Sequence, residues 1–555
     1  MTKVDGAFTE IVQSYLSAAA NEMKATLVRT SFNPVIYEVL DFGISVYDDK
    51  LDLIAEAPGL TFFLGANDYA VRRVLDYYGR ENLKEGDVLI SNYPYWNGAH
   101  AADATLMAPV FDADGKLFSV MLIRAHWMDL GAKDPGYVLD STDMHQEGLV
   151  FPGTKVFSDG KPVQEIIELI KFNSRMPEHV LGDLHAQVAA LRTGERRLHE
   201  ILKKFGRADL EAAIAAIQTH GETMTAEALK SLPKGSWSAE DILDDDGIGD
   251  DPVPMKVTVT ITDDDFTIDF DGSSGAAKGP INMPFGATQA ICKTVFKSLT
   301  TPHHVSNAGQ MRALKVKAEE GTLFHAKYPA PTYTLWTGIV ALELVFKAIA
   351  QAIPDRLAAS SGGDVPGFMM IGTHPDTGQM FAISNNEACG WGASPGHDGA
   401  SGLLHLSEAI VRTTPLEVME TKTTMLMERV ELTPDSGGAG THRGGAGVTR
   451  VIRFLDDGEF LTVVKKTKSP PWALNGGVQP AANRVTLFPG TDRERDVSTQ
   501  RTPVKAGDRI RVMSAGGGGH GAPAGRSREA IAADIAEGYV TLAAAKRDYG
   551  YEPDA

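Results

Sequence analysis

Two apolar runs joined by an Asp-Gly turn are the feature that most restricts the fold of this chain. Residues 104–111 and 117–125 are almost entirely apolar, and the five residues between them read Asp-Ala-Asp-Gly-Lys. An Asp-Gly turn between two such runs is typical of a β-hairpin. If Asp114 and Gly115 are the two turn residues, the pairing of every other residue in the hairpin follows. The sequence therefore predicts an antiparallel pair of strands and its register.

A His-x-x-Asp pair stands at each open end of this hairpin. His100 and Asp103 precede the first strand, and His126 and Asp129 follow the second. Counting outward from the turn places His126 opposite Asp103 and His100 opposite Asp129. Opposite residues of an antiparallel pair have Cβ atoms about 5 Å apart. The four side chains are therefore expected to meet at one end of the hairpin.

This set of side chains indicates a metal site. Imidazole and carboxylate groups together suit Zn²⁺, Mn²⁺ or Fe²⁺, and we favour Mn²⁺ or Zn²⁺ as the divalent metal. Two histidines and one or two aspartates leave coordination positions open, which a metal needs to polarise a carbonyl group or activate water. The alternative is that these residues cap turns or hydrogen-bond within a polar loop, and the spacing alone does not decide between the two.

Three further residues are candidates for substrate binding. Arg124 lies in the second apolar run, and Glu147 follows some twenty residues later. Each could bind an anionic substrate, and each could equally form an ion pair. Cys389 stands in a glycine-rich loop that could line a substrate cleft, although a lone cysteine more often packs in a core.

Across the whole chain the pattern predicts a mixed α+β fold in two regions. Residues 1–232 combine helical periodicity with strand-like runs and carry the predicted metal site, whereas residues 233–555 are rich in strand-like runs. The boundary follows a change in composition, because the segment after residue 232 is rich in Pro, Gly and acidic residues. Helices of the second region are expected near 284–299, 335–353 and 401–412.

Two glycine-rich runs, residues 436–447 and 515–521, stand among the strands of the second region. Backbone N–H groups of such runs can hold an anion, but neither run has the Lys-Ser/Thr ending of a phosphate loop. We predict tight turns between strands for both. No nucleotide site is predicted in this chain.

Charge and composition exclude several classes of partner. The chain has 72 acidic and 53 basic side chains and a formal net charge of −19, which disfavours nucleic acids and anionic membranes as main partners. The most apolar stretch, 335–353, contains Glu343 and Lys347 and therefore predicts a buried helix rather than a membrane span. With two cysteines and no signal-peptide pattern, the predicted location is the cytoplasm.

Around the predicted metal site the sequence resembles the hydantoinase B/oxoprolinase family. The same superfamily includes the large subunits of ATP-dependent acetone and acetophenone carboxylases. The resemblance extends over nearly the whole chain as blocks in the same order. Its landmarks include NYPYWNGAHAADATLMAPVF (92–111), RAHWMDLGAKDPG (124–136), VLGDLHAQVAALRTGERR (180–197) and PDSGGAGTHRGGAGVTR (434–450).

The resemblance implies a partner and a set of metal ligands. Family members work with a second subunit of the hydantoinase A type, which has an actin-like ATPase fold and would use ATP to phosphorylate an intermediate. In the carboxylase relatives the ligands match His100, Asp103 and His126 of this sequence. Asp129 is an additional candidate, expected to orient His100 or to act as a general base, and His126 is expected to share in catalysis.

The implied function is ATP-dependent hydrolysis of a cyclic amide such as a hydantoin, a lactam or 5-oxoproline. Because an unactivated amide is a poor electrophile, phosphorylation of its carbonyl oxygen would prepare it for attack at the metal. The alternatives are a ketone carboxylase subunit, which would join CO₂ from carboxyphosphate to an enolate, and a non-catalytic scaffold subunit. Tyr93 replaces an aspartate of the common family pattern, so the resemblance does not fix the substrate.

Overall fold

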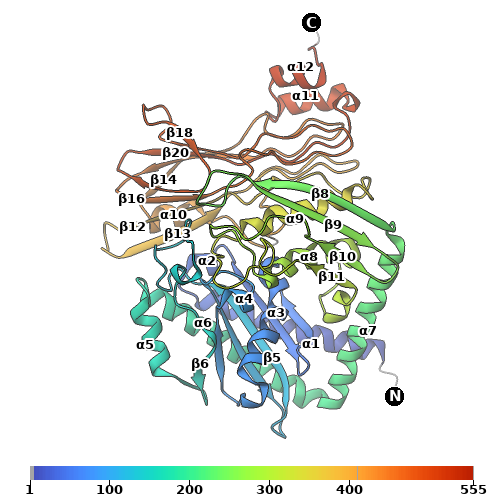
Figure 1. Ribbon diagram of the computed structural model, residues 1–555, viewed down its shortest axis with the longest axis vertical. Coiled ribbons are helices and arrows are strands. Elements are labelled where there is room, and N and C mark those ends of the chain that lie inside the picture. Colours follow the sequence, from blue (N-terminus) through green and yellow to red (C-terminus); the bar gives the residue numbers. More distant parts are fainter. Residues whose placement is uncertain (1–4, 409, 554–555) are drawn as a thin grey trace. The chain divides into compact units, whose positions relative to one another are not determined.

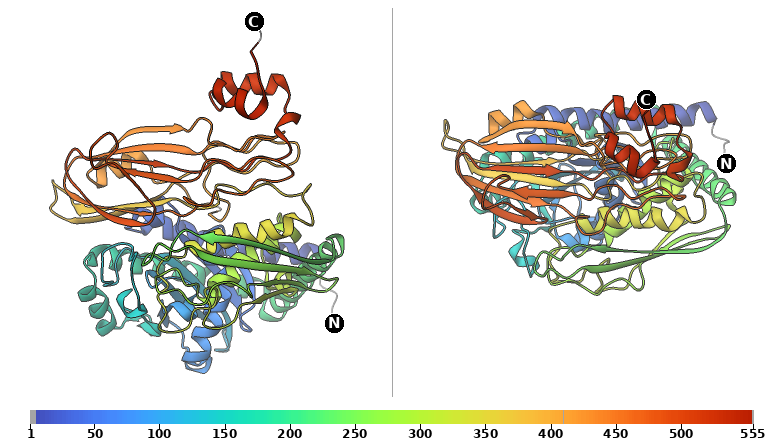
Figure 2. Two further views of the ribbon diagram at one scale, coloured as in Figure 1. Left: turned by 45° about the horizontal axis from the view of Figure 1, so that its top comes forward. Right: turned by 90° about the horizontal axis from the view of Figure 1, so that it is seen from above.

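The computed structural model describes residues 5–408 and 410–553 and confirms a mixed α+β fold (Figures 1 and 2). The chain divides into two compact units. The first holds the chain up to Ser236 together with Val259–Asp271 and Gly275–Leu335, and the second holds Trp237–Thr258, Gly272–Ser274 and the chain from Trp336. This partition differs from the single predicted boundary after residue 232, because the segment 275–335 returns to the first unit.

A seven-stranded sheet forms the centre of the first unit. Its order is β2-β1-β5-β4-β3-β6-β7, and every neighbouring pair is antiparallel. The strands are β1 (Phe42–Asp48), β2 (Leu53–Ala57), β3 (Val88–Ser91), β4 (Asp103–Phe111), β5 (Leu117–His126), β6 (Pro152–Ser158) and β7 (Lys161–Pro162). β1, β3, β4 and β5 are buried along almost their whole length because helices cover both faces of the sheet.

The predicted hairpin is β4–β5, and its register is confirmed, since Asp103 pairs with His126. The turn is longer than the two residues assumed. The backbone N–H of Asp112 donates to the Lys116 carbonyl, and Gly115 has a φ of 73°, which is the pattern of a three-residue loop with glycine in the left-handed region. A register shift at Phe111 compensates for the extra residue.

Helices pack on both sides of this sheet (Figure 1). α1 (Gly6–Thr30) and α6 (Pro177–Phe205) pack on each other and on one face, and α7 (Arg207–Ser231) packs on α1. α3 (Thr61–Tyr78) lies against β1 and β6 and packs closely on α8 (Phe285–Thr300). A Cβ atom at Gly65 would lie 2.6 Å from Ala290 Cα, so the absence of a side chain at Gly65 allows this close approach.

Short elements complete the first unit. Four other strands form a further sheet, and only the last two of them along the chain lie wholly in that unit. The short elements are α2 (Pro34–Tyr37), η1 (Arg80–Asn82), α4 (Pro94–Asn97), η2 (Met144–Gln146), α5 (Gln164–Asn173) and η3 (Ala308–Met311). The sheet has the order β11-β10-β9-β8, with β8 (Gly235–Leu243), β9 (Val253–Ile261), β10 (Phe266–Asp269) and β11 (Leu314–Lys317). Buried and half-exposed residues alternate along β9, as expected for a strand covered on one face.

The second unit contains a β-sandwich. One sheet has the order β13-β12-β16-β19 and the other β14-β15-β20-β17-β18. The strands are β12 (Gly367–Thr373), β13 (Met380–Asn386), β14 (Met425–Leu432), β15 (Val448–Phe454), β16 (Gly458–Val463), β17 (Arg484–Leu487), β18 (Arg495–Val497), β19 (Gln500–Val504) and β20 (Arg509–Met513). Buried apolar side chains from both sheets, such as Phe368, Phe454 and Phe460, form one core.

The helices of the second unit are α9 (Trp336–Ala350), α10 (Leu416–Lys422), η4 (Pro523–Gly525), α11 (Arg528–Ala536) and α12 (Leu542–Tyr549). α8 and α9 lie where helices were predicted. Over the described residues of 401–412 no helix forms, which corrects the third prediction. There the backbone of Leu403 exchanges hydrogen bonds with Cys389, and these bonds replace those of a helical turn.

The glycine-rich runs do not form the predicted tight turns. Their backbones lie against one another without side chains between them. The N–H of Gly517 donates to the Gly445 carbonyl at 2.9 Å, and that of Gly445 donates to the Trp391 carbonyl at 2.8 Å. A Cβ atom at Gly517 would lie 1.8 Å from the Trp391 carbonyl oxygen. Glycine is therefore required here for close backbone packing.

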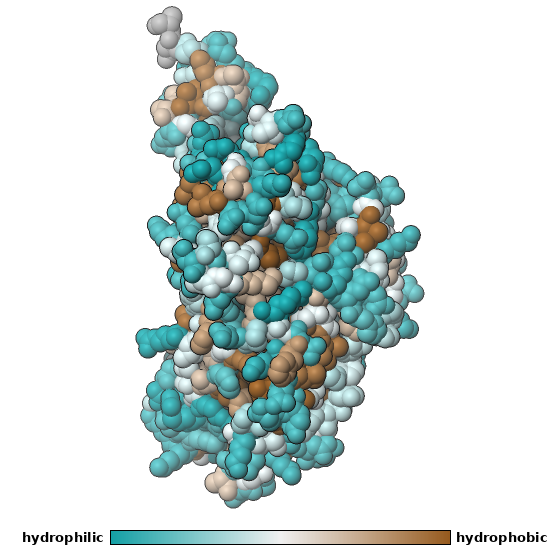
Figure 3. Space-filling model, turned by 90° about the vertical axis from the view of Figure 1, so that its left-hand side faces the viewer, coloured by the Kyte–Doolittle hydropathy of each residue, from teal (hydrophilic) through white to brown (hydrophobic). Residues whose placement is uncertain are grey.

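The surface combines hydrophilic residues with separate apolar patches on the face shown in Figure 3. Exposed apolar side chains of the first unit include Phe32, Leu169 and Phe172. Among the described residues, no helix combines the length and the apolar character needed to cross a membrane. The apolar stretch predicted to be a buried helix corresponds to α9, whose side chains are almost all buried.

Candidate metal centre

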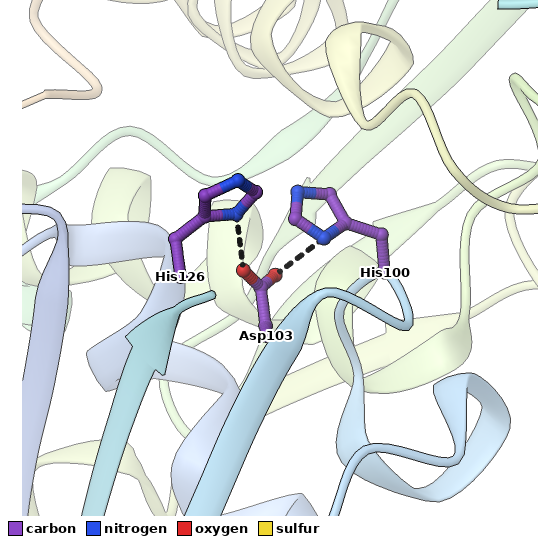
Figure 4. Close-up of side chains that lie close together, drawn as sticks. All are labelled: His100, Asp103 and His126. Atoms are coloured by element: carbon purple, nitrogen blue, oxygen red, sulfur yellow. Dashed lines mark hydrogen bonds and ion pairs between the residues drawn. The ribbon is translucent and has the colours of Figure 1, made fainter. Parts of the chain in front are cut away.

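Three predicted ligands meet at the open end of the β4–β5 hairpin (Figure 4). His100 Nδ1 lies 3.1 Å from Asp103 Oδ2, and His126 Nδ1 lies 3.1 Å from Asp103 Oδ1. All three side chains are buried, and their ligand atoms lie within 4.8 Å of one another. One carboxylate therefore lies between two imidazole rings, one from the loop before β4 and one from the last residue of β5.

Hydrogen bonds from asparagine side chains to backbone carbonyls hold the loop that carries His100. The Asn97 side-chain amide donates to the Asp103 carbonyl at 2.8 Å, and that of Asn92 donates to the Ala101 carbonyl at 2.6 Å. Gly98 ends α4 with a φ of 69° and lies close to α8. The loop thus brings His100 back over the first residue of β4.

The donor set fits a divalent metal. Two imidazoles and one carboxylate with open positions are the ligands of several Fe²⁺, Mn²⁺ and Zn²⁺ sites. Burial lowers the pKa of His100 to about 4, so this ring is neutral and able to act as a ligand at neutral pH. Nδ1 of His100 and Oδ2 of Asp103 are buried and form no hydrogen bond of normal geometry with the described residues. A bound cation would satisfy these polar atoms.

Asp129 does not join this cluster, which corrects the prediction of four converging side chains. Its Oδ1 accepts hydrogen bonds from the Gly131 N–H at 3.1 Å and from Arg175 Nη2 at 2.6 Å. Its Oδ2 accepts from the backbone N–H and Nε of Arg175. The pairing of β4 with β5 ends at Asp103 and His126, so His100 and Asp129 lie beyond the ladder and are not opposed. Asp129 is therefore placed to anchor a loop rather than to orient His100.

Arg124 lies beneath the cluster and is fully buried. Its Nε donates to Thr105 Oγ1 at 3.1 Å, and its Nη2 donates to the Asn97 carbonyl. Burial lowers the pKa of Arg124 to about 10, against the opposing effect of the Asp103 charge. The side chain has no exposed surface, so its contacts indicate support of the His100 loop instead of the predicted binding of substrate.

Glu147 is also buried, and its partners assign it a positioning role. It accepts hydrogen bonds from the backbone N–H groups of Thr332 at 2.8 Å and Tyr333 at 3.0 Å, and from the Ser141 hydroxyl at 2.8 Å. Burial raises its pKa to about 7, although these hydrogen bonds oppose the shift. Glu147 thereby fixes the segment that carries Tyr333.

Two tyrosines that sequence reasoning missed lie against the metal-ligand rings. Tyr333 stacks on His100 with ring centroids 5.2 Å apart, and Tyr137 stacks on His126 at 5.6 Å. The Tyr333 hydroxyl donates to the Gly136 carbonyl at 2.9 Å. Tyr333 is buried, whereas Tyr137 is partly exposed, so of these two rings only that of Tyr137 reaches the surface. The hairpin pattern gave no signal for either residue, because both lie outside the hairpin. Tyr333 lies far from it along the chain.

Asp41 is a further residue near the cluster. The backbone N–H of His126 donates to the Asp41 carbonyl at 3.5 Å. The Oδ1 of Asp41 is buried without a hydrogen-bond partner among the described residues. Burial raises the pKa of Asp41 to about 7, which the charge of His126 opposes. Its position directly before β1, whose Phe42 pairs with Ala125, is the sequence signal that could have placed it beside His126.

Cys389 belongs to the second unit and does not line a cleft. Its side chain is fully buried, and its Sγ donates to the Ser361 carbonyl at 3.4 Å. A Cβ atom at Gly362 would lie 2.6 Å from this sulfur. Burial raises the pKa of the thiol well above its ordinary value. The predicted role in substrate binding is therefore replaced by one in packing.

Known proteins are similar to this chain in sequence and fold. Residues 5–523 match the model of the family described as hydantoinase B/oxoprolinase. The B subunit of a putative D-/L-hydantoinase from Pseudomonas sp. (strain NS671) is 28% identical over 99% of this chain and 95% of its own length. The beta subunit of caprolactamase from Pseudomonas jessenii is 28% identical over 99% of this chain and 96% of its own length.

Solved structures extend this comparison to three dimensions. The crystal structure of ATP-dependent caprolactamase from Pseudomonas jessenii matches with a TM-score of 0.91 at 27% identity, over 100% of this chain and 97% of its own. A nucleotide-free acetone carboxylase matches with a TM-score of 0.89, over 98% of this chain and 79% of its own, and its 17% identity shows likeness of fold alone. The family match over residues 5–523 confirms the resemblance seen in the sequence, and this chain belongs to the hydantoinase B/oxoprolinase family.

Proposed function

We propose that this chain is the metal-binding, catalytic subunit of an ATP-dependent hydrolase that opens a cyclic amide. The observation that carries the proposal is the buried cluster of His100, Asp103 and His126, against which the partly exposed Tyr137 stacks. Support for the reaction class comes from relatives named as a hydantoinase subunit and a caprolactamase subunit. Hydantoins and lactams share the ring amide on which such a site would act.

The residues of the cluster have distinct tasks in this proposal. His100, Asp103 and His126 would hold the metal, which supplies a Lewis acid for the amide carbonyl or for water. Asp103 lies between the two rings, and its Oδ1 is hydrogen-bonded to His126 Nδ1, which orients that ring. Tyr333 stacks on His100 and excludes water from one side of it. Tyr137 lies at the partly exposed border and would contact the substrate ring.

We further propose that ATP is used on a partner subunit of the hydantoinase A type, in a hetero-oligomer. Two relatives are named as the B or the beta subunit of their enzymes, which supports an assembly of unlike chains. The caprolactamase of known structure is ATP-dependent, which supports the use of ATP. Phosphorylation of the amide oxygen on that partner would make the carbonyl carbon electrophilic enough for attack.

The carboxylase alternative rests on weaker support. The match with acetone carboxylase is one of fold, at 17% identity, and fold does not determine chemistry. Incorporation of isotopically labelled bicarbonate into the product would nevertheless identify a carboxylase, because hydrolysis of an amide forms no carbon–carbon bond.

Metal analysis and a turnover assay test the proposal together. The wild-type chain is compared with the variant His100→Ala/His126→Ala, and with a control variant in which the exposed His145 and His220 are replaced by alanine. We expect close to one metal per chain in the wild type and the control, and none in the cluster variant. With the partner and ATP, hydrolysis of hydantoin or caprolactam should follow the metal content. Full turnover by the metal-free variant would contradict the proposal, and circular dichroism checks that all variants fold.

A further inference from the structure

A pocket lies in the first unit, beside strands β1 and β2 of the central sheet, and it is lined by residues other than the three metal-ligand candidates. Its volume is about 490 Å³, and its walls come from β1, β2, α3, α8 and the segment around η3. Tyr47 lines this pocket and pairs with Val120 of β5. At about 3.3 Å per residue, the strand from Val120 to His126 spans about 20 Å. The pocket is therefore separate from the metal cluster.

Register places two polar side chains on the sheet face that borders the pocket. Ser45 pairs with Glu56 across β1 and β2, so the two side chains lie on the same face. Tyr47 follows Ser45 by two residues and shares that face. Asn67 of α3 donates to Ser45 Oγ at 3.0 Å, which shows that the face is covered by α3. Glu56 and Tyr47 thus lie between the sheet and this helical layer.

The lysines of the pocket are already bound to protein oxygens. Lys297 uses all three N–H groups of its ammonium. They donate to the carbonyls of Thr301 and His304 and to Gln310 Oε1, at 3.1, 2.7 and 3.2 Å. Lys293 forms an ion pair with Asp68. Neither lysine is therefore a good binding group for an anionic ligand.

The two arginines of the pocket are paired in the same way. Arg72 binds Asp52 at 2.7 Å, and Arg312 forms an ion pair with Glu222. An anion entering the pocket would have to displace one of these carboxylates from its arginine, at a cost that its own binding would have to exceed.

Glu56 differs from the other acidic residues of the pocket. Asp52 and Asp68 have ion-pair partners, whereas Glu56 has none among the residues that the structure describes. Its hydrogen-bonding neighbour is Ser306. Burial raises the pKa of Glu56 against the opposing effects of Ser306 and Lys297. A half-buried carboxylate in this state is stabilised by a positively charged hydrogen-bond donor.

Tyr47 supplies a second polar group for a ligand. Its side chain is fully buried, and its hydroxyl has no hydrogen bond of normal geometry in the described part of the chain. Burial raises its pKa well above the ordinary value, so the hydroxyl keeps its proton and its lone pairs can accept a hydrogen bond. Half-buried apolar side chains complete the walls. They include Leu53, Leu64 and Met311.

We propose that this pocket binds a small organic ammonium ion, with its charged nitrogen at the Glu56 carboxylate and its apolar body against Leu53, Leu64 and Met311. The ammonium group would donate to Glu56, which forms no ion pair with the described residues, and to the Tyr47 hydroxyl, which has no hydrogen bond of normal geometry among them. The volume falls within the range of small-molecule sites in proteins. This site goes beyond the proposed hydrolase function and requires neither the metal nor the partner subunit.

A ligand-observed NMR titration of the full chain tests the proposal with three probes of one length: n-hexylammonium, hexan-1-ol and hexanoate. We expect saturable binding of n-hexylammonium, and at least tenfold weaker binding of the alcohol and the carboxylate. Glu56→Gln should weaken n-hexylammonium at least tenfold, whereas Asp52→Asn, which removes a carboxylate already paired with Arg72, should change it less than threefold. The variant His100→Ala/His126→Ala should bind n-hexylammonium like the wild type.

A blocking variant makes the test independent of any loss of folding in Glu56→Gln. Ser298 is exposed on α8 and lines the pocket, so Ser298→Trp should exclude n-hexylammonium while leaving Glu56 in place. Equal binding of hexan-1-ol and n-hexylammonium would show an apolar cavity without charge recognition and would overturn the proposal. Preference for hexanoate, or unchanged affinity in both Glu56→Gln and Ser298→Trp, would also overturn it.

Discussion

The two His-x-x-Asp pairs of this chain have the same spacing in the sequence, but only one of them stays together in the structure. His100 and Asp103 stay together, with 3.1 Å between Nδ1 and Oδ2. His126 and Asp129 separate, since His126 faces Asp103 while Asp129 binds Arg175. The comparison teaches that a spacing of three residues brings two side chains together only where the backbone between them turns in the right way.

The backbone after β5 explains the difference. The N–H of Trp127 still donates to the Ala102 carbonyl at 2.9 Å, but the ladder of strand pairs has ended. The Trp127 indole is buried and donates to Gln187 of α6 at 2.8 Å, which directs the chain toward the helices. Two residues later Asp129 therefore meets Arg175 instead of His100.

Replacing Asp103 should have the largest effect on this comparison. Asp103→Ala removes the acceptor shared by both rings, so we expect metal affinity to fall by more than about 100-fold, beyond the range for loss of an outer partner. Metal content after dialysis measures this. Asp129→Ala is the matched control and should keep the metal. Equal metal content in the two variants would remove the distinction between the two pairs.

Glu147→Ala should have the next largest effect, on the surroundings of the first pair. It leaves the N–H groups of Thr332 and Tyr333 without their acceptor, so the free energy of unfolding should fall by about 3 kcal/mol. Urea unfolding measures this loss. Metal affinity should also fall, because Tyr333 is no longer held on His100. A stability equal to that of the wild type would show that Glu147 does not position this segment.

Asp129→Asn should have a smaller effect, confined to the second pair. It weakens the contacts with Arg175, whose side chain is 35% exposed while Asp129 is buried. Solvent screening of the arginine limits the expected loss to about 1 kcal/mol in the free energy of unfolding. Metal content should not change. Loss of metal in this variant would return Asp129 to the cluster and revive the prediction of four converging groups.

The pH dependence of stability gives the most specific signal. Because burial raises the pKa of Glu147 to about 7, the folded state binds its proton more tightly than the unfolded state. This contribution to stability is fully present below the ordinary pKa of 4.5 and is lost as the pH rises through about 7. Relative to Glu147→Gln, the wild type should therefore lose stability between pH 5 and 7, by at most about 1.4 kcal/mol per pH unit. Parallel pH profiles of the two proteins would contradict this assignment.

Much of the site could be predicted because it depends on local patterns. Two apolar strands around an Asp-Gly turn set the register that brings Asp103 opposite His126. Tyr333 could not be predicted, because it reaches His100 from a segment far along the chain that Glu147 holds in place. The prediction of tight turns at the two glycine-rich runs is wrong for a related reason. Their composition permits both a tight turn and close backbone packing, and only the neighbouring backbones decide.

The sequence by itself determined the hairpin, its register, three metal-ligand candidates and the family, because these follow from periodicity, turn chemistry and motifs within short stretches. The tertiary structure decided that Asp129 binds Arg175, that Arg124 and Cys389 are buried, and that two tyrosines cover the ligand rings. Those outcomes depend on which distant side chain or backbone group comes close enough to compete for each polar atom. No spacing within one stretch of chain contains that information.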